Sequence, residues 1–268
     1  MQESESVVNT LLKDYLYDLV KEGKRLDGRS FDEIRPIEIK EGTFTKSEGE
    51  AWVKLGKTQV LVGVKFDVGE PFPDTPDKGV LVTNAELLPV ASPTFEPGPP
   101  NEDAIEISRV VDRAIRSADA VDLNSLVIKE GELVYMIFLD MYALDHDGNL
   151  DDALTIASLI ALGRAKYPKV VYKGDGEIEV LEDKESLVLK DLPINFTFVK
   201  IGDALLLDPV LEEEMVAEAS ITIAINQEGK VCSIQKRHGY FTMEEIKKAV
   251  EIGRSKWTDV ASVIRREI

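Results

Sequence analysis

The sequence AWVKLGKTQVLVGVK occupies residues 51–65 and decides the fold. Val-rich runs flank a Gly56-Lys57 turn, which is typical of an antiparallel β-hairpin. A second stretch, ASITIAINQEGKVCSIQK at residues 219–236, repeats the order of strand, Gly-Lys turn and strand. The repetition indicates an α+β protein of two duplicated lobes. A chance match between two ordinary hairpins explains the pattern about equally well.

Strands and helices alternate along the rest of the chain. Apolar residues at helical spacing predict an amphipathic helix over residues 7–24 and a second helix from the Asn101 cap through Val121. Two further helices are predicted over residues 150–164 and 242–266. The remaining apolar runs predict strands at 79–88, 126–128, 133–144, 194–201 and 204–207, and a sheet edge or insertion at 177–189.

The composition is that of a folded protein without a membrane span. Of 268 residues, 44% are hydrophobic and 31% are charged, which is typical of a globular chain with a sizeable core. No apolar stretch reaches the roughly 20 residues of a spanning helix. The N-terminus is acidic and then amphipathic, unlike a secretory signal. We therefore expect a cytoplasmic protein that does not bind a membrane.

The net charge of −18 limits how the chain can bind nucleic acid. Proteins that bind nucleic acids usually present a basic face, because the release of counterions drives association. An acidic excess of this size argues against independent RNA binding. RNA contact is expected only through a local basic cluster or beside a more basic partner.

Candidate metal ligands are few. The single cysteine, Cys232, excludes an internal disulfide and a cysteine-cluster metal site, and is expected to be a small buried residue. The two histidines, His146 and His238, are far apart and are expected to be structural or exposed. One strand and its turn carry carboxylates without a complete ligand set, namely Asp140, Asp145 and Asp147. The sequence therefore predicts no metal and no cofactor.

Several segments, in a fixed order, resemble the RNase PH family. They are Arg25–Arg29, Glu33–Pro36, Glu48-Gly49 with Gly56–Val60, Glu106–Arg113 and Ala217–Ser220. The resemblance covers about residues 20 to 260. It implies the RNase-PH-like fold, also described as ribosomal protein S5 domain 2-like, with duplicated lobes of mixed sheet and helix. The expected division is an N-terminal helix and lead-in at 1–28, lobe 1 at 29–170 and lobe 2 at 171–268.

Within that family, the chain is most similar to the non-catalytic subunit of the archaeal exosome ring. Active members carry a Gly-Thr-Arg-Ser-type loop at a helix N-terminus, where backbone N–H groups and an arginine hold inorganic phosphate. The matching loop here lacks arginine and carries Asp151 and Asp152, whose charges would repel an anion. Active members also carry a catalytic aspartate where this chain has Ser220. A hydroxyl cannot replace a carboxylate in proton transfer, so no catalytic residue is expected.

The resemblance also implies partners. A homologous catalytic RNase-PH-like subunit is expected to pair with this chain, and three such heterodimers would close a hexameric ring. The ring would degrade single-stranded RNA from 3′ to 5′ with phosphate, and RNA-binding cap subunits would sit on it. Two alternatives remain open: an active phosphorolytic exoribonuclease that works alone, and a scaffold that never touches RNA.

A row of arginines is the candidate RNA contact. Arg109, Arg113 and Arg116 are spaced i, i+4 and i+7, so they share one helical face. Each guanidinium is able to fork onto a phosphate, and the resemblance implies that this helix faces the RNA path. The alternative is a solvated face neutralised by Glu106 and Asp112.

Three other charged groups are expected to be structural. The basic run Lys236–His238 fits an exposed strand end better than a nucleic-acid site. Asp27, Arg29 and Arg35 are expected to form ion pairs that fix the N-terminal segment. The run Glu212–Glu214 is expected to be a solvated helix or loop face.

Overall fold

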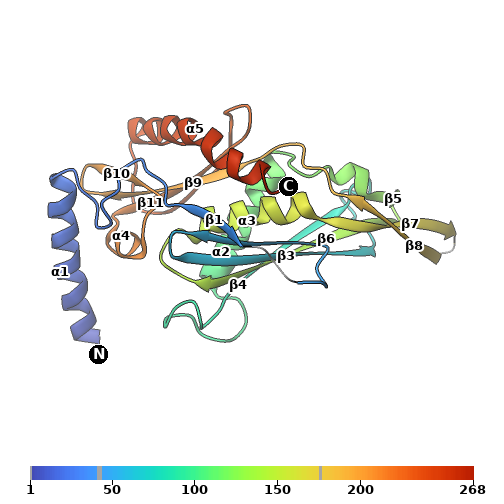
Figure 1. The fold of residues 1–268 in the computed structure, drawn as a ribbon, viewed down its shortest axis with the longest axis horizontal. Helices are drawn as coiled ribbons and strands as arrows, with labels where there is room; N and C mark the ends of the chain where they lie inside the picture. The colour runs from blue at the N-terminus through green and yellow to red at the C-terminus, as the bar shows by residue number, and fades with distance from the viewer. Residues whose placement is uncertain (1, 41–43, 175–176) are drawn as a thin grey trace.

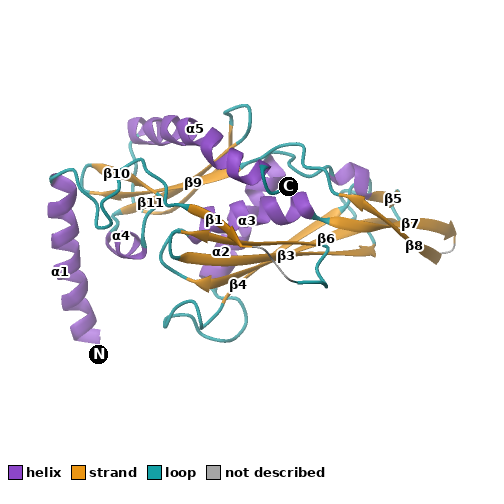
Figure 2. Ribbon diagram, viewed as in Figure 1, coloured by secondary structure: helices purple, strands orange, loops and turns teal. Residues whose placement is uncertain are grey.

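The computed structural model describes residues 2–40, 44–174 and 177–268. Figure 1 shows the path of the chain, and Figure 2 separates its helices from its strands. The helices are α1 (Gln2–Lys21), α2 (Glu102–Ser117), α3 (Leu150–Arg164), α4 (Leu211–Val216) and α5 (Met243–Arg265), with a 3-10 turn at Leu123–Leu126. The strands are β1 (Ile37–Lys40), β2 (Gly49–Leu55), β3 (Thr58–Gly69), β4 (Val80–Leu87), β5 (Val127–Lys129), β6 (Leu133–Asp145), β7 (Lys166–Gly174), β8 (Glu177–Ser186), β9 (Ile194–Ile201), β10 (Ala204–Leu207), β11 (Ala219–Ile225) and β12 (Val231–His238).

The first sheet is mixed, in the order β1-β2-β3-β6-β4, with β5 paired to β6. The predicted hairpin at residues 51–65 is confirmed, because β2 and β3 pair in antiparallel register with Val53 opposite Val60. Strand β4 lies parallel to β6. Parallel neighbours need a long connection, and here α2 carries the chain from the end of β4 back toward the start of β6.

The second sheet, in the order β10-β9-β11-β12, is antiparallel throughout, whereas the lobes were both expected to contain mixed sheets. The reason lies in its connections. Tight turns at Gly202 and Gly229, both with positive φ, join β9 to β10 and β11 to β12. Two strands joined by so short a turn pair antiparallel. The predicted hairpin at 219–236 is confirmed, with Ile223 opposite Ile234.

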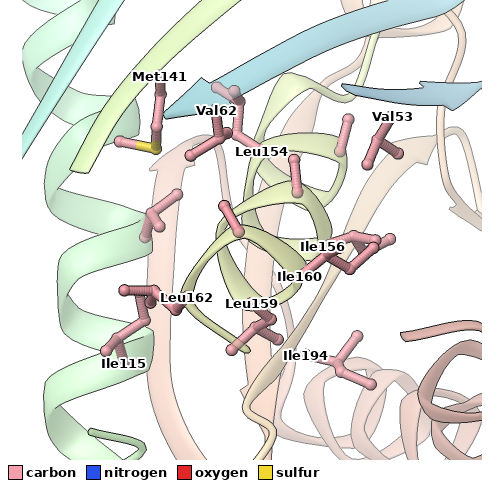
Figure 3. Packing of buried hydrophobic residues seen from close by; sticks show 14 of the residues in the cluster. Val53, Val62, Ile115, Met141, Leu154, Ile156, Leu159, Ile160, Leu162 and Ile194 are labelled. Carbon is pink, nitrogen blue, oxygen red and sulfur yellow. The ribbon is translucent and has the colours of Figure 1, made fainter. Parts of the chain in front are cut away.

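Helix α3 lies between the two sheets and makes one core of the two lobes. Every residue from Leu150 to Leu162 is buried, and a helix that is apolar on all sides is the kind that occupies a protein interior. Figure 3 shows its side chains packed among residues of both lobes, such as Val53 and Val62 on one side and Ile194 on another. The α+β class of two lobes is confirmed, and the main core is shared by both lobes.

The N-terminal helix packs on the second lobe. Leu16 is buried in a small cluster with Val199 and Leu206. Leu11 and Tyr15 remain 65% and 54% exposed. Helix α1 thus stands at one end of the molecule, opposite the ribbon formed by β7 and β8 (Figure 1). None of the helices in the described ranges has the length and apolar character needed to cross a membrane.

The ribbon of β7 and β8 was only partly predicted. The sequence indicated an edge or insertion at 177–189, and β8 fills most of that range with every residue exposed. Strand β7 was not predicted, and it contains Pro168. Proline is tolerated on an edge strand, and β7 pairs only with β8. The expected lobe boundary after residue 170 falls inside β7.

Two further differences are local. Helix α2 ends at Ser117, before the predicted Val121, because Asp119 has φ 52° and Ala120 donates its N–H to Ile115 O. A left-handed residue of this kind ends a helix. Cys232 is half-buried, whereas it was expected to be buried.

Candidate functional site

The segment after α1 is held by buried arginines that reach the second lobe. Arg25 forms an ion pair of 2.6 Å with Glu213, and both side chains are almost fully buried. Arg29 and Arg35 both pair with Asp208, at 3.0 and 2.7 Å. The predicted structural role of Arg29 and Arg35 is confirmed. The prediction of a solvated face at 212–214 is wrong for Glu213, which is 1% exposed.

Asp208 organises the loop before α3. Burial by itself raises the pKa of this carboxyl, but hydrogen bonds and charge from Arg35, followed by Arg29 and Asn149, outweigh burial and hold the pKa below its usual value. The amide of Asn149 donates to Asp208 Oδ1 at 2.6 Å. The guanidinium of Arg35 also donates to Asp147 O and Gly148 O. The same ion cluster therefore fixes the lead-in segment and the start of α3.

The loop at the start of α3 has the shape of an anion cradle. Asn149 caps the helix in a left-handed conformation, φ 56°, and accepts a hydrogen bond from Asp152 N. Gly148 has φ 87°, and a Cβ there would lie 2.6 Å from Leu211 N and Pro209 O. Only glycine fits so tight an approach. The path of the backbone at the start of α3 therefore depends on glycine at position 148 and on the Asn149 cap.

The side chain aimed from this loop into the second lobe is Asp151, and it is already paired. Its carboxylate receives Arg237 Nη2 at 3.0 Å. Burial raises the pKa of Asp151, and the charge of Arg237 opposes that rise. The carboxylate and guanidinium pair at the helix N-terminus through Arg237 Nη2, whereas the buried Arg237 Nε has no hydrogen-bond partner among the described residues. An incoming phosphate would have to displace Asp151 from its only cation partner in the described structure and then lie beside the displaced carboxylate.

A cavity of about 320 Å³ opens at this pair, between α2, α3, β9 and β11. Its charged lining is dominated by carboxylates: Asp103, Glu106, Asp151 and Glu214, facing Arg237 and two histidines. Burial raises the pKa of Glu214 to about 7. Burial, and then the charge of Arg237, lowers the pKa of His146, so this imidazole is neutral at pH 7. The cavity therefore has a net negative charge, which is unsuited to phosphate.

Ser220 lies in the wall of this cavity. It is buried on β11, 6% exposed, and lines the same space as Asp151. Of the residues singled out in the sequence, Asp151 and Ser220 thus meet at one site. Among the described residues, no group of three or more His, Cys, Asp or Glu side chains is placed to hold a metal ion.

Asp152 points away from the cavity into the interior. Its carboxyl accepts from Asn149 Nδ2 at 2.8 Å and from Thr197 N at 3.0 Å, and lies 2.7 Å from the Thr197 hydroxyl. Burial raises the pKa of this carboxyl to about 8, against the lowering effect of those hydrogen bonds. With this pKa the carboxyl is mainly protonated at pH 7, and the Thr197 hydroxyl donates to its Oδ1.

Replacing Asp152 by asparagine is expected to remove a pH dependence of stability. The folded carboxyl, with a pKa of about 8, holds a proton that the unfolded carboxyl releases near pH 4. The native free energy of unfolding therefore falls as pH rises between those values, while Asp152→Asn has no group that titrates at this position. The difference between variant and native protein should grow by about 1.4 kcal/mol per pH unit from pH 5 to 7. Urea unfolding at pH 5, 6, 7 and 8 measures it, and a constant difference would contradict the assignment.

The arginines of α2 lie in a row, and two of them contact different neighbouring strands, β12 and β4. Arg113 donates to Gln235 on β12. Arg116 pairs with Asp112 at 2.8 Å and donates to Leu81 O on β4. Arg109 is exposed one turn before Arg113. The row therefore spans the surface where α2 meets both lobes, and each guanidinium is exposed or partly exposed.

The alternative to RNA contact was that Glu106 and Asp112 neutralise the arginine row, and only one of these two carboxylates does so. Asp112 does pair with Arg116, whereas Glu106 accepts a hydrogen bond from Gln235. The basic run 236–238 does not act as a unit. Arg237 turns inward to Asp151, His238 lies at Ala217 O, and Lys236 donates to Gly239 O.

The fold and cavity define a class: two α+β lobes on a common core, with a polar site at the N-terminus of the shared helix. Residues 33–168 match domain 1 of the 3′ exoribonuclease family, RNase PH, and residues 191–256 match its domain 2. The chain belongs to this family, which confirms the resemblance seen in the sequence.

Individual relatives agree with this assignment. Exosome complex component Rrp42 of Pyrococcus horikoshii is 50% identical over 264 residues, which cover 98% of this chain and 96% of the relative. Its counterpart in Thermococcus kodakarensis is 48% identical over 270 residues, covering 100% and 99%. Among solved structures, a chain of the Archaeoglobus fulgidus exosome with RNA bound to the active site superposes with a TM-score of 0.88 at 43% identity, covering 96% of this chain and 98% of that chain.

Proposed function

We propose that this chain is a non-catalytic subunit of an archaeal exosome core that degrades RNA. The observation that carries the proposal is the Asp151–Arg237 ion pair. It lies in the cavity beside the loop that matches the phosphate-binding loop of the family's active members. A carboxylate stands where phosphate would bind, and the neutral Ser220 stands where a catalytic carboxylate would act. The relatives named above support membership of an exosome.

The partner we propose is a homologous, catalytic RNase-PH-like subunit. Three heterodimers would close a hexameric ring in the cytoplasm, with RNA-binding cap subunits on it. In phosphorolysis, an oxygen of inorganic phosphate attacks the 3′-terminal phosphodiester. The bond from that phosphorus to the 3′-oxygen of the preceding nucleotide breaks, and this oxygen takes up a proton and becomes the new 3′-hydroxyl of the shortened RNA. The terminal nucleotide is released as a nucleoside 5′-diphosphate. This chain would order the partner's site and bind the RNA backbone through Arg109, Arg113 and Arg116, without a cofactor or metal of its own.

The acidic excess of the chain is compatible with this role. Independent RNA binding needs an overall basic face, but a subunit of a ring needs only a local cation row beside a more basic partner. The α2 arginines provide such a row. Their exposure supports RNA contact, and the Asp112 pair limits it at Arg116 alone.

The purified chain is expected to release no nucleoside diphosphates from labelled poly(A) RNA with phosphate present. Addition of the homologous subunit is expected to restore phosphate-dependent degradation. The matched control mixes this chain with a homologous subunit whose catalytic carboxylate has been replaced. That mixture should assemble and remain inactive. Diphosphate release by the chain alone would overturn the proposal and favour the active exoribonuclease, with Arg237 as its phosphate ligand.

A further inference from the structure

A second cavity lies at the C-terminal end of α2, remote from the Asp151 cavity. It has a volume of about 200 Å³. Its floor is apolar and is formed by Leu81, Ile115, Val121 and Leu123. Its rim carries Phe72, Thr75, Lys78, Arg116 and Asp119. An apolar cavity with a few polar groups converging on it is the usual form of a small-molecule or nucleobase site.

The loop that carries Phe72 is held in place before any ligand arrives. Phe72 O accepts from Thr75 N, and Thr75 O accepts from Lys78 N. Gly79 N donates to Leu123 O at 2.8 Å, and Gly131 N donates to Pro76 O at 2.9 Å. Prolines at 71, 73 and 76 restrict the loop further. The ring of Phe72 is nevertheless 52% exposed. A pre-ordered exposed ring loses little entropy when a flat group stacks on it.

The polar rim has groups suited to both the phosphate and the base of a nucleotide. Lys78 is exposed, and Arg116, with a side chain 40% exposed, uses only part of its five N–H donors on Asp112 and Leu81 O. These cations suit a phosphate. Asp119 is held at φ 52° at the end of α2, an uncommon conformation outside glycine. Its carboxylate accepts hydrogen bonds, and adenine, cytosine and guanine carry an amino group that uracil lacks.

From this arrangement we infer that the cavity binds an unpaired nucleobase of single-stranded RNA, stacked on Phe72. Arg116 belongs both to the rim and to the α2 arginine row, so an RNA strand on that row reaches the cavity directly. The acidic side chains of the same loop, Asp74 and Asp77, do not line the cavity. The inference rests on the proposed function, because it presumes RNA on the α2 row. It adds a preference for bases with an amino group.

The test uses the full chain assembled with the homologous subunit, in phosphate-free buffer so that no RNA is degraded. The probe is an oligo(A) strand containing 2-aminopurine, whose fluorescence falls on stacking. Phe72→Ala is expected to weaken binding by roughly 5- to 150-fold and to abolish the quenching. The salt dependence should not change, because stacking releases no counterions. Phe72→Trp should retain both signals.

Phe44→Ala is the matched control, since Phe44 is 49% exposed in another loop. It should bind oligo(A) as the native assembly does. Asp119→Asn should reduce the preference for oligo(A) over oligo(U). Binding within twofold of native for Phe72→Ala overturns the inference, as does loss of assembly in size-exclusion chromatography, which would make Phe72 a protein contact. Displacement of the probe by equimolar ADP would overturn the assignment to an RNA strand.

Failure of this inference is distinguishable from failure of the proposed function. Charge reversal at Arg109 and Arg113 tests RNA contact along α2 without touching the cavity rim. If this variant loses RNA affinity and salt dependence while Phe72→Ala does not, RNA contact by the arginine row is supported and the nucleobase site is overturned. If neither variant changes binding, both fall.

Discussion

Asp208→Asn is expected to lower the free energy of unfolding by about 3–5 kcal/mol. Asparagine has nearly the same shape, but it removes the charge that balances Arg29 and Arg35. Both arginine side chains are less than one-tenth exposed, at 9% and 5%, and Arg29 would keep only Asp27 at 2.6 Å while Arg35 would keep only Asp147 at 3.7 Å. Removing one partner of a buried pair is far more costly than replacing the whole pair. Urea unfolding at pH 7, followed by circular dichroism, measures the loss.

Glu228→Gln is the matched control for Asp208. Glu228 pairs with Lys230 at 2.6 Å, but these side chains are 61% and 74% exposed. Solvent screens such a pair, so the change should be small compared with that of Asp208→Asn. Equal losses in the two variants would contradict the role given to Asp208.

The effect of Asp208 also has a defined pH dependence. Its folded pKa lies below the unfolded value of about 4, so its stabilising contribution is present above pH 4 and is lost as pH falls through the folded pKa. Asp152 acts in the opposite direction, because its folded pKa is raised. The difference between native protein and Asp208→Asn should therefore shrink below pH 4, whereas the Asp152→Asn difference changes between pH 5 and 7.

Reversing Arg109, Arg113 and Arg116 to glutamate together is expected to weaken RNA binding by the assembled ring on the order of a hundredfold. Each lost phosphate contact should also remove about 0.7 from the slope of log affinity against log salt, so the slope should fall by about 2. Fluorescence anisotropy with oligo(A) at several salt concentrations measures both. Unchanged affinity and slope would favour the scaffold that does not touch RNA.

The control for the arginine row is a second set of exposed cations. Lys247, Lys248 and Arg254 lie exposed on α5, and reversing them changes the net charge by the same amount. Arg254 donates to Gly229 O, as Arg116 donates to Leu81 O, so each set has one residue with a backbone contact. A large loss with the α5 set would show that total charge, not the position of α2, controls RNA binding.

Local pattern predicted most elements of the fold. The strands at 194–201 and 204–207 and the helix at 150–164 were predicted with the bounds observed, because apolar runs and turn residues mark them in the sequence itself. Strand β7, which contains Pro168, was not predicted. The end of α2 was misplaced because no local signal indicated that Asp119 adopts a left-handed conformation.

The candidate site contains pairings between side chains that local sequence pattern could not predict. Asp151, Asp152 and Ser220 were singled out through the family resemblance, and two of them line one cavity. The partner of Asp151 was not expected: Arg237 is 86 positions away, in a run that looked like an exposed strand end. Glu213 looked solvated in an acidic run, and only a distant arginine makes its burial tolerable. Such pairings depend on tertiary contact, for which the charge pattern of a short segment carries no signal.

The pair of Arg25 and Glu213 joins positions 188 residues apart in the chain. Proteins are synthesised at about 5–20 residues per second, so roughly 10–40 seconds separate the two side chains on the ribosome. Throughout that interval Arg25 lacks Glu213, and Arg29 and Arg35 lack Asp208 for nearly as long. The stretch made early in translation is consequently among the last to reach its native place, and premature closure of the first lobe over it is disfavoured until the second lobe has emerged.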